Sequence, residues 1–210
     1  MKANQSQEGQ DWVQQRCGAF TASRASDLMA KTRSGPSASR GALLALLAVE
    51  RLTGHPVETY CNAAMQRGTD LEAEAREAYS FATGHAVIEV GFCQHATIPR
   101  CGASPDGLVG DDGLVELKCP ANMAKHLDSL RTGAHAQEYR WQLQHQMLVT
   151  GRQWVDAVSY DPRFPDGLQL AIQRVGRDED AIAELVAEIK KADAEVMAMV
   201  AELHSIKEAA

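Results

Sequence analysis

The stretch that most constrains the fold is residues 104–118, which read S-P-D-G-L-V-G-D-D-G-L-V-E-L-K. Two short apolar runs flank a Gly-Asp-Asp-Gly segment, whose residue types tolerate the positive φ angles of a tight turn. The pattern predicts a β-hairpin. Because side chains alternate along a strand, Glu116 and Lys118 leave one face of the second strand, and Val115 and Leu117 point to the other face, into a core.

Asp106 lies on the first strand of this hairpin, near the point where the second strand returns Glu116. Two carboxylates and the Lys118 ammonium then meet at one end of a sheet. Such acids can bind Mg²⁺ and leave positions for water and a phosphate oxygen. The metal lowers the pKa of a bound water, and a lysine beside it orients that water or stabilises the transition state. A surface ion pair on an ordinary hairpin would also contain E-x-K, but the preceding S-P-D-G makes the pattern more specific.

Composition favours one domain spanning residues 1–210, since 210 residues of which 45% are hydrophobic can bury a sizeable core. No apolar run approaches the length of a membrane span, and no signal peptide is visible, so we expect no membrane contact and a cytoplasmic protein. The five cysteines form no CxxC pair, which speaks against a zinc site or a disulfide framework. Residues 1–10 are polar and expected to be flexible.

Charge is unevenly distributed along the chain. The net charge of −7 argues against a generic nucleic-acid binder. Residues 12–49, however, hold five basic residues against one acid, and residues 178–210 hold nine acids against three lysines. A basic front and an acidic tail predict one side that faces phosphate and one that is solvated or faces a partner.

Periodicity and turn residues predict a succession of helices and strands. The expected helices are 21–31, capped by Thr21 or Ser23, then 40–53, 62–83 with a break at Gly68, 121–132, 137–150 and 178–207; the expected strands are 86–96, 154–160 and 168–175, with a flexible loop at 32–39. The apolar stripe of the last helix packs on its own domain or partly on a neighbouring subunit. Two roles stay open: Ser23 is a helix cap or a phosphate ligand, and Gln142 is half-exposed or orients a water.

Five ordered blocks resemble the phage lambda exonuclease family, also called YqaJ-like viral recombinases, within the PD-(D/E)xK nuclease superfamily. They are R-C-G-A-F-T-A-S (16–23), A-K-T-R-S-G (30–35), R-G-T-D-L-E (67–72), S-P-D-G with E-L-K-C-P (104–120) and Q-L-Q-H-Q-M-L-V-T-G (142–151). The resemblance implies an α/β restriction-endonuclease-like core, with a mixed central β-sheet flanked by helices. It also implies Mg²⁺-dependent, processive 5′-to-3′ digestion of linear double-stranded DNA. Such digestion releases 5′-mononucleotides and leaves 3′ single strands for recombination by annealing.

The resemblance also implies roles for individual residues. The metal site would use Asp106, Glu116 and the main-chain carbonyl of Leu117, with Lys118 as the catalytic lysine and Glu72 and Gln142 completing the shell. The 5′-phosphate pocket would use Arg16, Ser23 and Ser104, while Arg33 would reach the DNA and Met65 would be the apolar wedge at the end base pair. Two Mg²⁺ ions, replaceable by Mn²⁺, a ring-shaped homotrimer and a phage-type single-strand annealing partner are implied as well, in a bacterial or phage-infected cell.

Two other functions remain open from the sequence. A restriction- or nicking-type endonuclease could use the same core, although a single domain of this size has little room for a region that reads sequence. A catalytically inactive scaffold that binds DNA ends is the other alternative. The presence of Asp106, Glu116 and Lys118 together speaks against it, because a scaffold needs none of them.

Overall fold

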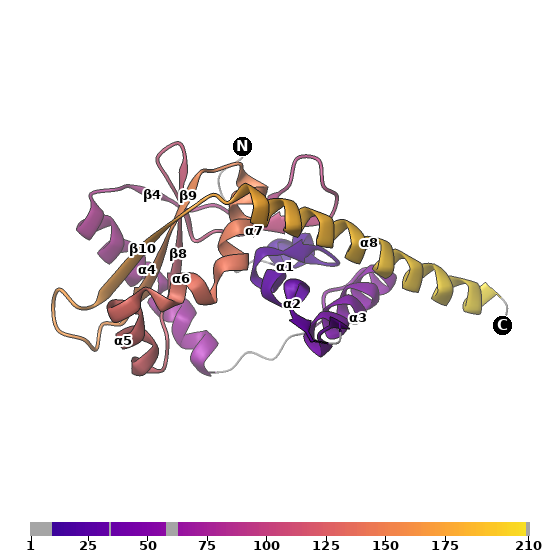
Figure 1. Ribbon diagram of the computed structural model, residues 1–210, viewed down its shortest axis with the longest axis horizontal. Helices are drawn as coiled ribbons and strands as arrows, with labels where there is room; N and C mark the ends of the chain where they lie inside the picture. The colour runs from indigo at the N-terminus through magenta and orange to yellow at the C-terminus, as the bar shows by residue number, and fades with distance from the viewer. Residues whose placement is uncertain (1–9, 34, 58–62, 209–210) are drawn as a thin grey trace.

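The central element is a mixed five-stranded sheet in the order β10-β9-β8-β7-β4, seen in a computed structural model that describes residues 10–33, 35–57 and 63–208 (Figure 1). Strands β8 and β9 are parallel, and every other neighbouring pair is antiparallel. The strands are β4 (Val87–Ile88), β7 (Gly107–Val109), β8 (Gly113–Lys118), β9 (Trp154–Tyr160) and β10 (Leu170–Gly176). The predicted α/β fold with a mixed central sheet is confirmed.

The predicted hairpin is the pair β7–β8, in which Gly107 lies opposite Val115. Gly110 begins the turn with a φ of 52°, a left-handed conformation that glycine adopts without steric cost. Gly113 allows the side chain of Trp154 to approach the backbone of β8 closely. A Cβ atom there would lie 2.1 Å from the ring of Trp154, so the indole packs directly on the backbone of β8.

Helices cover both faces of the sheet. On one face α4 (Ala63–Thr83) packs on the side chains of Val115 and Leu117, as the strand alternation predicts. On the other face lie α6 (Ala134–Glu138) and α7 (Arg140–Thr150), which pack on β8 and β9 through Leu143 and Met147. The helix α5 (Met123–Thr132) lies against the ends of β9 and β10.

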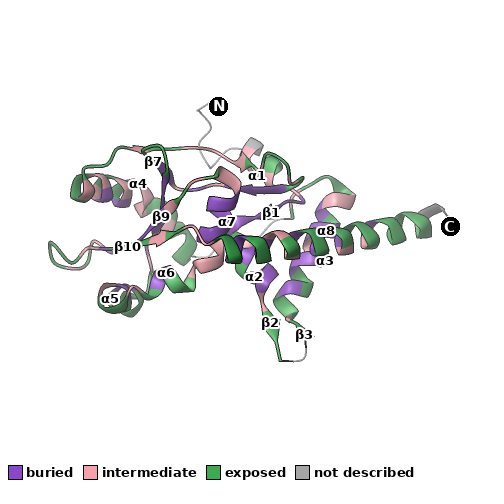
Figure 2. Cartoon of the chain, turned by 45° about the horizontal axis from the view of Figure 1, so that its top comes forward, coloured by how far each residue is buried: buried purple, intermediate pink, exposed green. Residues whose placement is uncertain are grey.

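The largest core lies beside this sheet, where α8 (Glu179–Glu208) packs against α3 (Ala38–Thr53). The same part of the fold contains α1 (Gln10–Arg16), β1 (Phe20–Thr21), the 3₁₀ helix η1 (Ala22–Arg24), α2 (Ala25–Met29), β2 (Lys31–Thr32), β3 (Gly35–Pro36), β5 (Cys93–Gln94) and β6 (Cys101–Ala103). Strands β1, β6 and β5 form a three-stranded sheet. The C-terminal part of α8 extends past the body, and Figure 2 shows it largely exposed there.

Several predicted elements differ from the structure. The expected single strand 86–96 is two short strands that belong to different sheets, β4 and β5, so the chain crosses from one sheet to the other there. The expected helix 137–150 is divided at Tyr139, whose φ of −100° and ψ of 15° leave the helical region. The predicted break at Gly68 is wrong, because α4 is continuous through it.

The segment around Ser23 also differs from its prediction. The expected helix 21–31 is a 3₁₀ turn followed by the five-residue α2, and neither Thr21 nor Ser23 caps it. Instead the Ser23 hydroxyl lies 3.3 Å from that of Thr21 and accepts a hydrogen bond from Arg16. The expected flexible loop 32–39 contains a small antiparallel pair, β2–β3.

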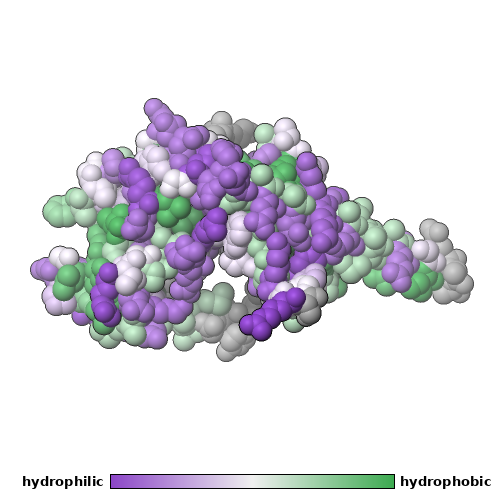
Figure 3. All heavy atoms as spheres, viewed as in Figure 1, coloured by the Kyte–Doolittle hydropathy of each residue, from purple (hydrophilic) through white to green (hydrophobic). Residues whose placement is uncertain are grey.

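The acidic tail neutralises part of the predicted basic front, because the fold packs α8 against the N-terminal part. Arg40 pairs with Glu188 and Glu195 of α8, and Lys31 pairs with Glu184. Figure 3 shows polar side chains gathered across the middle of the visible face, between the sheet and the α3–α8 part. Within the described ranges, the front residues that make no ion pair are Arg16, Arg24 and Arg33.

The sequence predicts neither a membrane span nor a disulfide framework, and both features concern the described part of the chain. None of its helices combines the length and the apolar character needed to span a bilayer. Its cysteines, Cys17, Cys93, Cys101 and Cys119, are all free thiols. Cys61 and the N-terminal residues 1–9, which were expected to be flexible, lie outside the described residues.

Candidate active site

The end of the hairpin brings the predicted acids and lysine together. Lys118 Nζ lies 2.6 Å from Glu116 Oε1, as their shared strand face requires. Asp106 directly precedes β7, and its Oδ2 accepts a hydrogen bond of 2.6 Å from the Leu117 amide. The hairpin register therefore places both carboxylates and the ammonium at one end of β8.

The Glu116 carboxylate is held from the opposite side by α7. The side-chain amide of Gln142 donates to Oε1, and that of Gln146 donates to Oε2. Sequence reasoning placed both glutamines beside the apolar row of this helix but selected only Gln142 for the site. The available signal was the Q-x-x-x-Q spacing, since residues four apart share one face of a helix.

Glu72 of α4 faces the same site, where it is accompanied by an arginine that sequence reasoning missed. Arg76, one helical turn later, donates to Glu72 Oε1 over 2.6 Å and pairs with Glu89 over 3.0 Å. Its Nε also donates to the main-chain carbonyl of Asp106 over 3.4 Å. Arg76 therefore links α4 to the start of the hairpin. Its position four residues after Glu72 could have revealed this contact from the sequence, because such residues share one face of a helix.

Burial and mutual repulsion shift the ionisation of these groups. Burial, followed by the charge of Glu116, raises the pKa of Asp106 well above its ordinary value. Burial also raises the pKa of Glu72, against the opposing charge of Arg76. Burial lowers the pKa of Lys118, but the carboxylates of Glu116 and Asp106 outweigh it and raise that pKa overall. Three acids crowded against one lysine and one arginine make an environment that favours an added cation.

A pocket of about 560 Å³ opens over this cluster. One wall belongs to α4, and the other is formed by the end of β8, the loop after it, and Tyr139. The structure places Met65 in the α4 wall, where its side chain is exposed, and places Asp106, Leu117 and Lys118 in the floor. The lining residues are Ala64, Met65, Gly68, Glu72, Asp106, Leu117, Lys118, Cys119, Pro120, Ala121, Asn122, Lys125 and Tyr139.

The donor set suits a hard cation. Within the described ranges, no three His, Cys, Asp or Glu side chains form a group that could hold a metal. An ion here would therefore take the carboxylates of Asp106 and Glu116, the main-chain carbonyl of Leu117, and further oxygens from water or phosphate. Mg²⁺ is bound in this way, through one or two carboxylates and several waters.

The residues expected to bind a 5′ phosphate form a second group, joined by a tryptophan. Arg16 Nη2 donates to Ser23 Oγ over 3.0 Å, and the Arg16 guanidinium lies 4.3 Å from the centre of the Trp12 ring. The Trp12 indole in turn donates to Ser104 Oγ over 2.9 Å. Sequence reasoning missed Trp12, whose signal was its position four residues before Arg16 on a short helix.

The Arg16 guanidinium is half-buried and forms no ion pair with a carboxylate of the described residues, although the charge of Glu50 acts on it. Burial, together with the nearby charge of Arg24, lowers its pKa to about 10. It remains charged at neutral pH and is free to bind an anion. Arg33, by contrast, lies exposed in the turn between β2 and β3, and it does not line the pocket.

The chain is similar to one protein family and to several solved structures. Residues 11–153 match the model of the YqaJ-like viral recombinase domain. The crystal structure of an alkaline exonuclease (LHK-Exo) from Laribacter hongkongensis is 46% identical, with a TM-score of 0.88, and covers 96% of this chain and 100% of that chain. The same exonuclease in complex with dAMP gives the same identity and coverage with a TM-score of 0.89.

A phage-related exonuclease from Haemophilus somnus 129PT is more distant. It is 14% identical with a TM-score of 0.73, and the match covers 88% of this chain and 96% of that chain. At that identity the likeness shows the fold alone. No curated protein matches the chain significantly.

Proposed function

The chain belongs to the YqaJ-like viral recombinase family, and on this basis we propose that it is a magnesium-dependent exonuclease that acts processively on linear double-stranded DNA. It digests one strand from 5′ to 3′, releases 5′-mononucleotides and leaves 3′ single strands for recombination by annealing. The observation that carries the proposal is the convergence of Asp106, Glu116 and Lys118 at one end of β8. Asp106, Lys118 and Glu72 also line the pocket that opens there. The dAMP bound to the 46% identical exonuclease supports a mononucleotide product.

Asp106, Glu116 and the Leu117 carbonyl would hold up to two Mg²⁺ ions, which Mn²⁺ can replace. When bound, magnesium offsets the charge that develops on the phosphate and activates the attacking water. Lys118 adds a fixed positive charge beside the reacting phosphate. The amide of Gln142 keeps the Glu116 carboxylate in one orientation, so the site is arranged before DNA arrives.

We assign the Arg16, Ser23 and Ser104 group to the terminal 5′ phosphate. A guanidinium can bind phosphate through two hydrogen bonds, and hydroxyl groups add further donors. Each cut leaves a new 5′ phosphate, so the same group can bind the shortened strand again. Met65 would separate the end base pair as an apolar wedge, and Arg33 would contact the duplex further from the cut.

Processive digestion is explained if three copies of the chain form a ring around DNA. A closed ring repeats one interface by rotation, and a ring that encircles DNA remains on it until the end is reached. Light scattering is expected to give a trimer, and a monomer at micromolar concentration would contradict the ring. We further propose that a phage-type single-strand annealing protein receives the 3′ strand.

A linear duplex labelled at its 5′ end, incubated with Mg²⁺, tests the proposed activity. Mononucleotide products support the exonuclease. Discrete fragments would instead indicate an endonuclease, and intact DNA would indicate a scaffold that binds ends. A closed circular duplex is the matched control, because an exonuclease needs an end and should leave it intact.

A further inference from the structure

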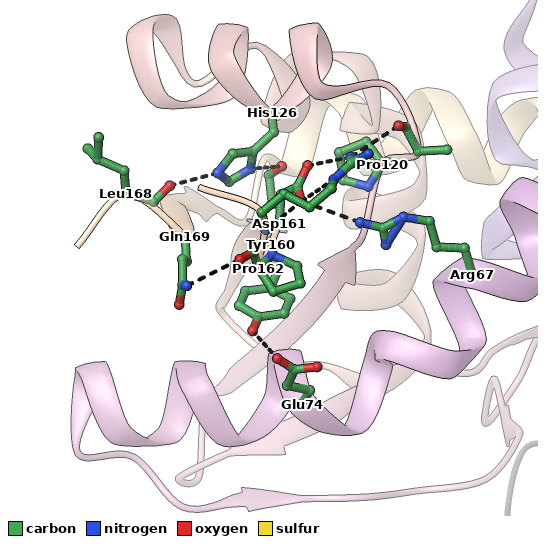
Figure 4. A network of polar contacts seen from close by, with 12 residues as sticks. Arg67, Glu74, Pro120, His126, Tyr160, Asp161, Pro162, Leu168 and Gln169 are labelled. Atoms are coloured by element: carbon green, nitrogen blue, oxygen red, sulfur yellow. Dashed lines mark hydrogen bonds and ion pairs between the residues drawn. The ribbon is translucent and has the colours of Figure 1, made fainter. Parts of the chain in front are cut away.

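A fully buried carboxylate lies outside the pocket, directly after β9. Asp161 is bound by Arg163, whose Nε donates to Oδ1 over 2.7 Å and whose Nη2 donates to Oδ2 over 2.6 Å. Arg67 reaches from α4 and donates to Oδ1 over 3.3 Å (Figure 4). The hydrogen bonds from Arg163 lower the pKa of Asp161 to about 2, so the group is charged at neutral pH.

The two arginines connect this carboxylate to opposite walls of the pocket. Arg67 belongs to α4, the helix that forms one wall. Arg163 Nη2 also donates to the main-chain carbonyls of Pro120 over 3.3 Å and Ala121 over 3.1 Å, and both residues line the other wall. A single buried charge is thus shared between the two walls.

A second contact beside Asp161 also fixes α4 to the sheet. The hydroxyl of Tyr160 donates to Glu74 over 2.7 Å, and Figure 4 shows this contact beside Asp161. Glu72 belongs to α4, whereas Asp106 and Lys118 belong to the hairpin. Their separation therefore depends on how α4 is fixed to the sheet, and an error of about 1 Å in an active site can cost about 100-fold in rate.

We propose that Asp161 is a positioning residue, which acts through Arg67 and Arg163 to fix the width of the pocket and so the placement of Glu72 opposite Asp106 and Lys118. The inference rests on the proposed function, because it concerns the metal site of that function. Asp161 touches neither the metal ligands nor the pocket. Groups that bind metal ligands directly change metal affinity or activity by about 10- to 100-fold when altered, and Asp161 acts one contact further away, so we expect the lower end of that range.

Asp161→Asn keeps the shape of the side chain and removes the charge that both arginines share. Mn²⁺ is the probe, because its binding is measured by electron paramagnetic resonance without any reaction. We expect the dissociation constant for Mn²⁺ to rise about 10-fold, and the Mg²⁺ concentration for half-maximal cleavage to rise in parallel. If this variant does not fold, Arg67→Met decides, since it cuts only the α4 link and leaves the Asp161–Arg163 pair in place.

Glu50→Gln is the matched control. Glu50 is also a buried acid, but it lies on α3, where it accepts hydrogen bonds from the main-chain amides of Gly18 over 2.7 Å and Val57 over 3.2 Å. It makes no link to α4 among the described residues and does not line the pocket. The change should lower the melting temperature without changing Mn²⁺ affinity.

The outcomes separate the two proposals. Weaker Mn²⁺ binding in Asp161→Asn or Arg67→Met, with normal binding in Glu50→Gln, supports the positioning role. Normal Mn²⁺ binding in the folded Asp161 and Arg67 variants overturns it and leaves the proposed function intact. Equal weakening in the Glu50 control would also overturn it, because a general loss of stability then explains the effect. A wild-type protein that binds no Mn²⁺ would overturn both proposals.

Discussion

Replacing Arg40 with methionine should destabilise the protein more than any change to a surface ion pair. Arg40 lies in the first turn of α3, and its side chain is only 5% exposed. It donates to Glu188 over 2.8 Å and to both oxygens of Glu195 over 2.9 and 3.1 Å, which joins α3 to α8. The variant keeps the apolar stem but leaves two glutamates of α8 side by side without a partner.

The expected loss follows from the burial of these groups. Breaking a buried pair by removing one partner costs about 3–5 kcal/mol. Glu188 is 17% exposed and Glu195 is 39% exposed, so water relieves part of the penalty. We therefore expect the lower end, about 3 kcal/mol, which lowers the melting temperature of a chain of this size by about 6–12 °C.

Urea and thermal unfolding of wild type and Arg40→Met measure the loss of stability. Lys31→Met is the control. The Lys31–Glu184 pair also joins the N-terminal part to α8, but its side chains are 62% and 50% exposed, and such pairs contribute about 0–1 kcal/mol. The reasoning would be refuted if Arg40→Met and Lys31→Met lost equal stability, or if Arg40→Met lost less than about 1 kcal/mol.

The pH dependence gives a second check. Hydrogen bonds from Arg40 lower the pKa of Glu195 below its ordinary value of 4.5. A lowered folded-state pKa stabilises the protein above the unfolded pKa, and this contribution is lost as the pH falls through the folded value. The difference in stability between wild type and Arg40→Met should therefore shrink as the solution is acidified below the ordinary pKa of glutamate.

The remaining predictions concern the proposed activity. Asp106→Asn and Glu116→Gln should abolish cleavage of linear duplex DNA while the circular dichroism spectrum stays that of wild type, and full activity in either would remove the site from the hairpin. Lys118→Ala should reduce the single-turnover rate about 10²- to 10³-fold, and a rate within a few-fold of wild type would make Lys118 a surface residue only. Arg16→Ala should slow digestion of 5′-phosphorylated ends about 10-fold or more and affect 5′-hydroxyl ends much less, measured at one salt concentration; an unchanged preference would contradict the assignment.

The hairpin and its chemistry could be predicted because they depend on neighbouring residues. Turn glycines and strand alternation determine which side chains share a face, so Glu116 and Lys118 could be paired from the sequence alone. Gln146 and Arg76 were within reach of the same reasoning, since each lies one helical turn from a residue already selected.

Other features depend on contacts between distant segments. The pairing of Arg40 with Glu188 and Glu195 joins residues about 150 positions apart, and local charge counts therefore predicted two separate sides where the fold brings them together. The division of residues 86–96 between two sheets likewise follows from their different strand partners, Val109 and Leu108 for β4 and Ala103 and Gly102 for β5. No pattern within the segment itself reveals those partners.

The long helix α8 should show two kinds of amide hydrogen exchange. Its buried positions Leu185, Ile189 and Val196 belong to the main core, so their amide protons exchange only when the whole protein unfolds. The C-terminal end of α8 extends past the body (Figure 1). Leu203 and Ile206, near that end of the helix, are exposed, and the amides there open locally and exchange much sooner. The protection factor along one uninterrupted helix would then fall between Val196 and Leu203. If another protein covers this end of α8 in the cell, the amides near Leu203 would be protected as strongly as those near Val196.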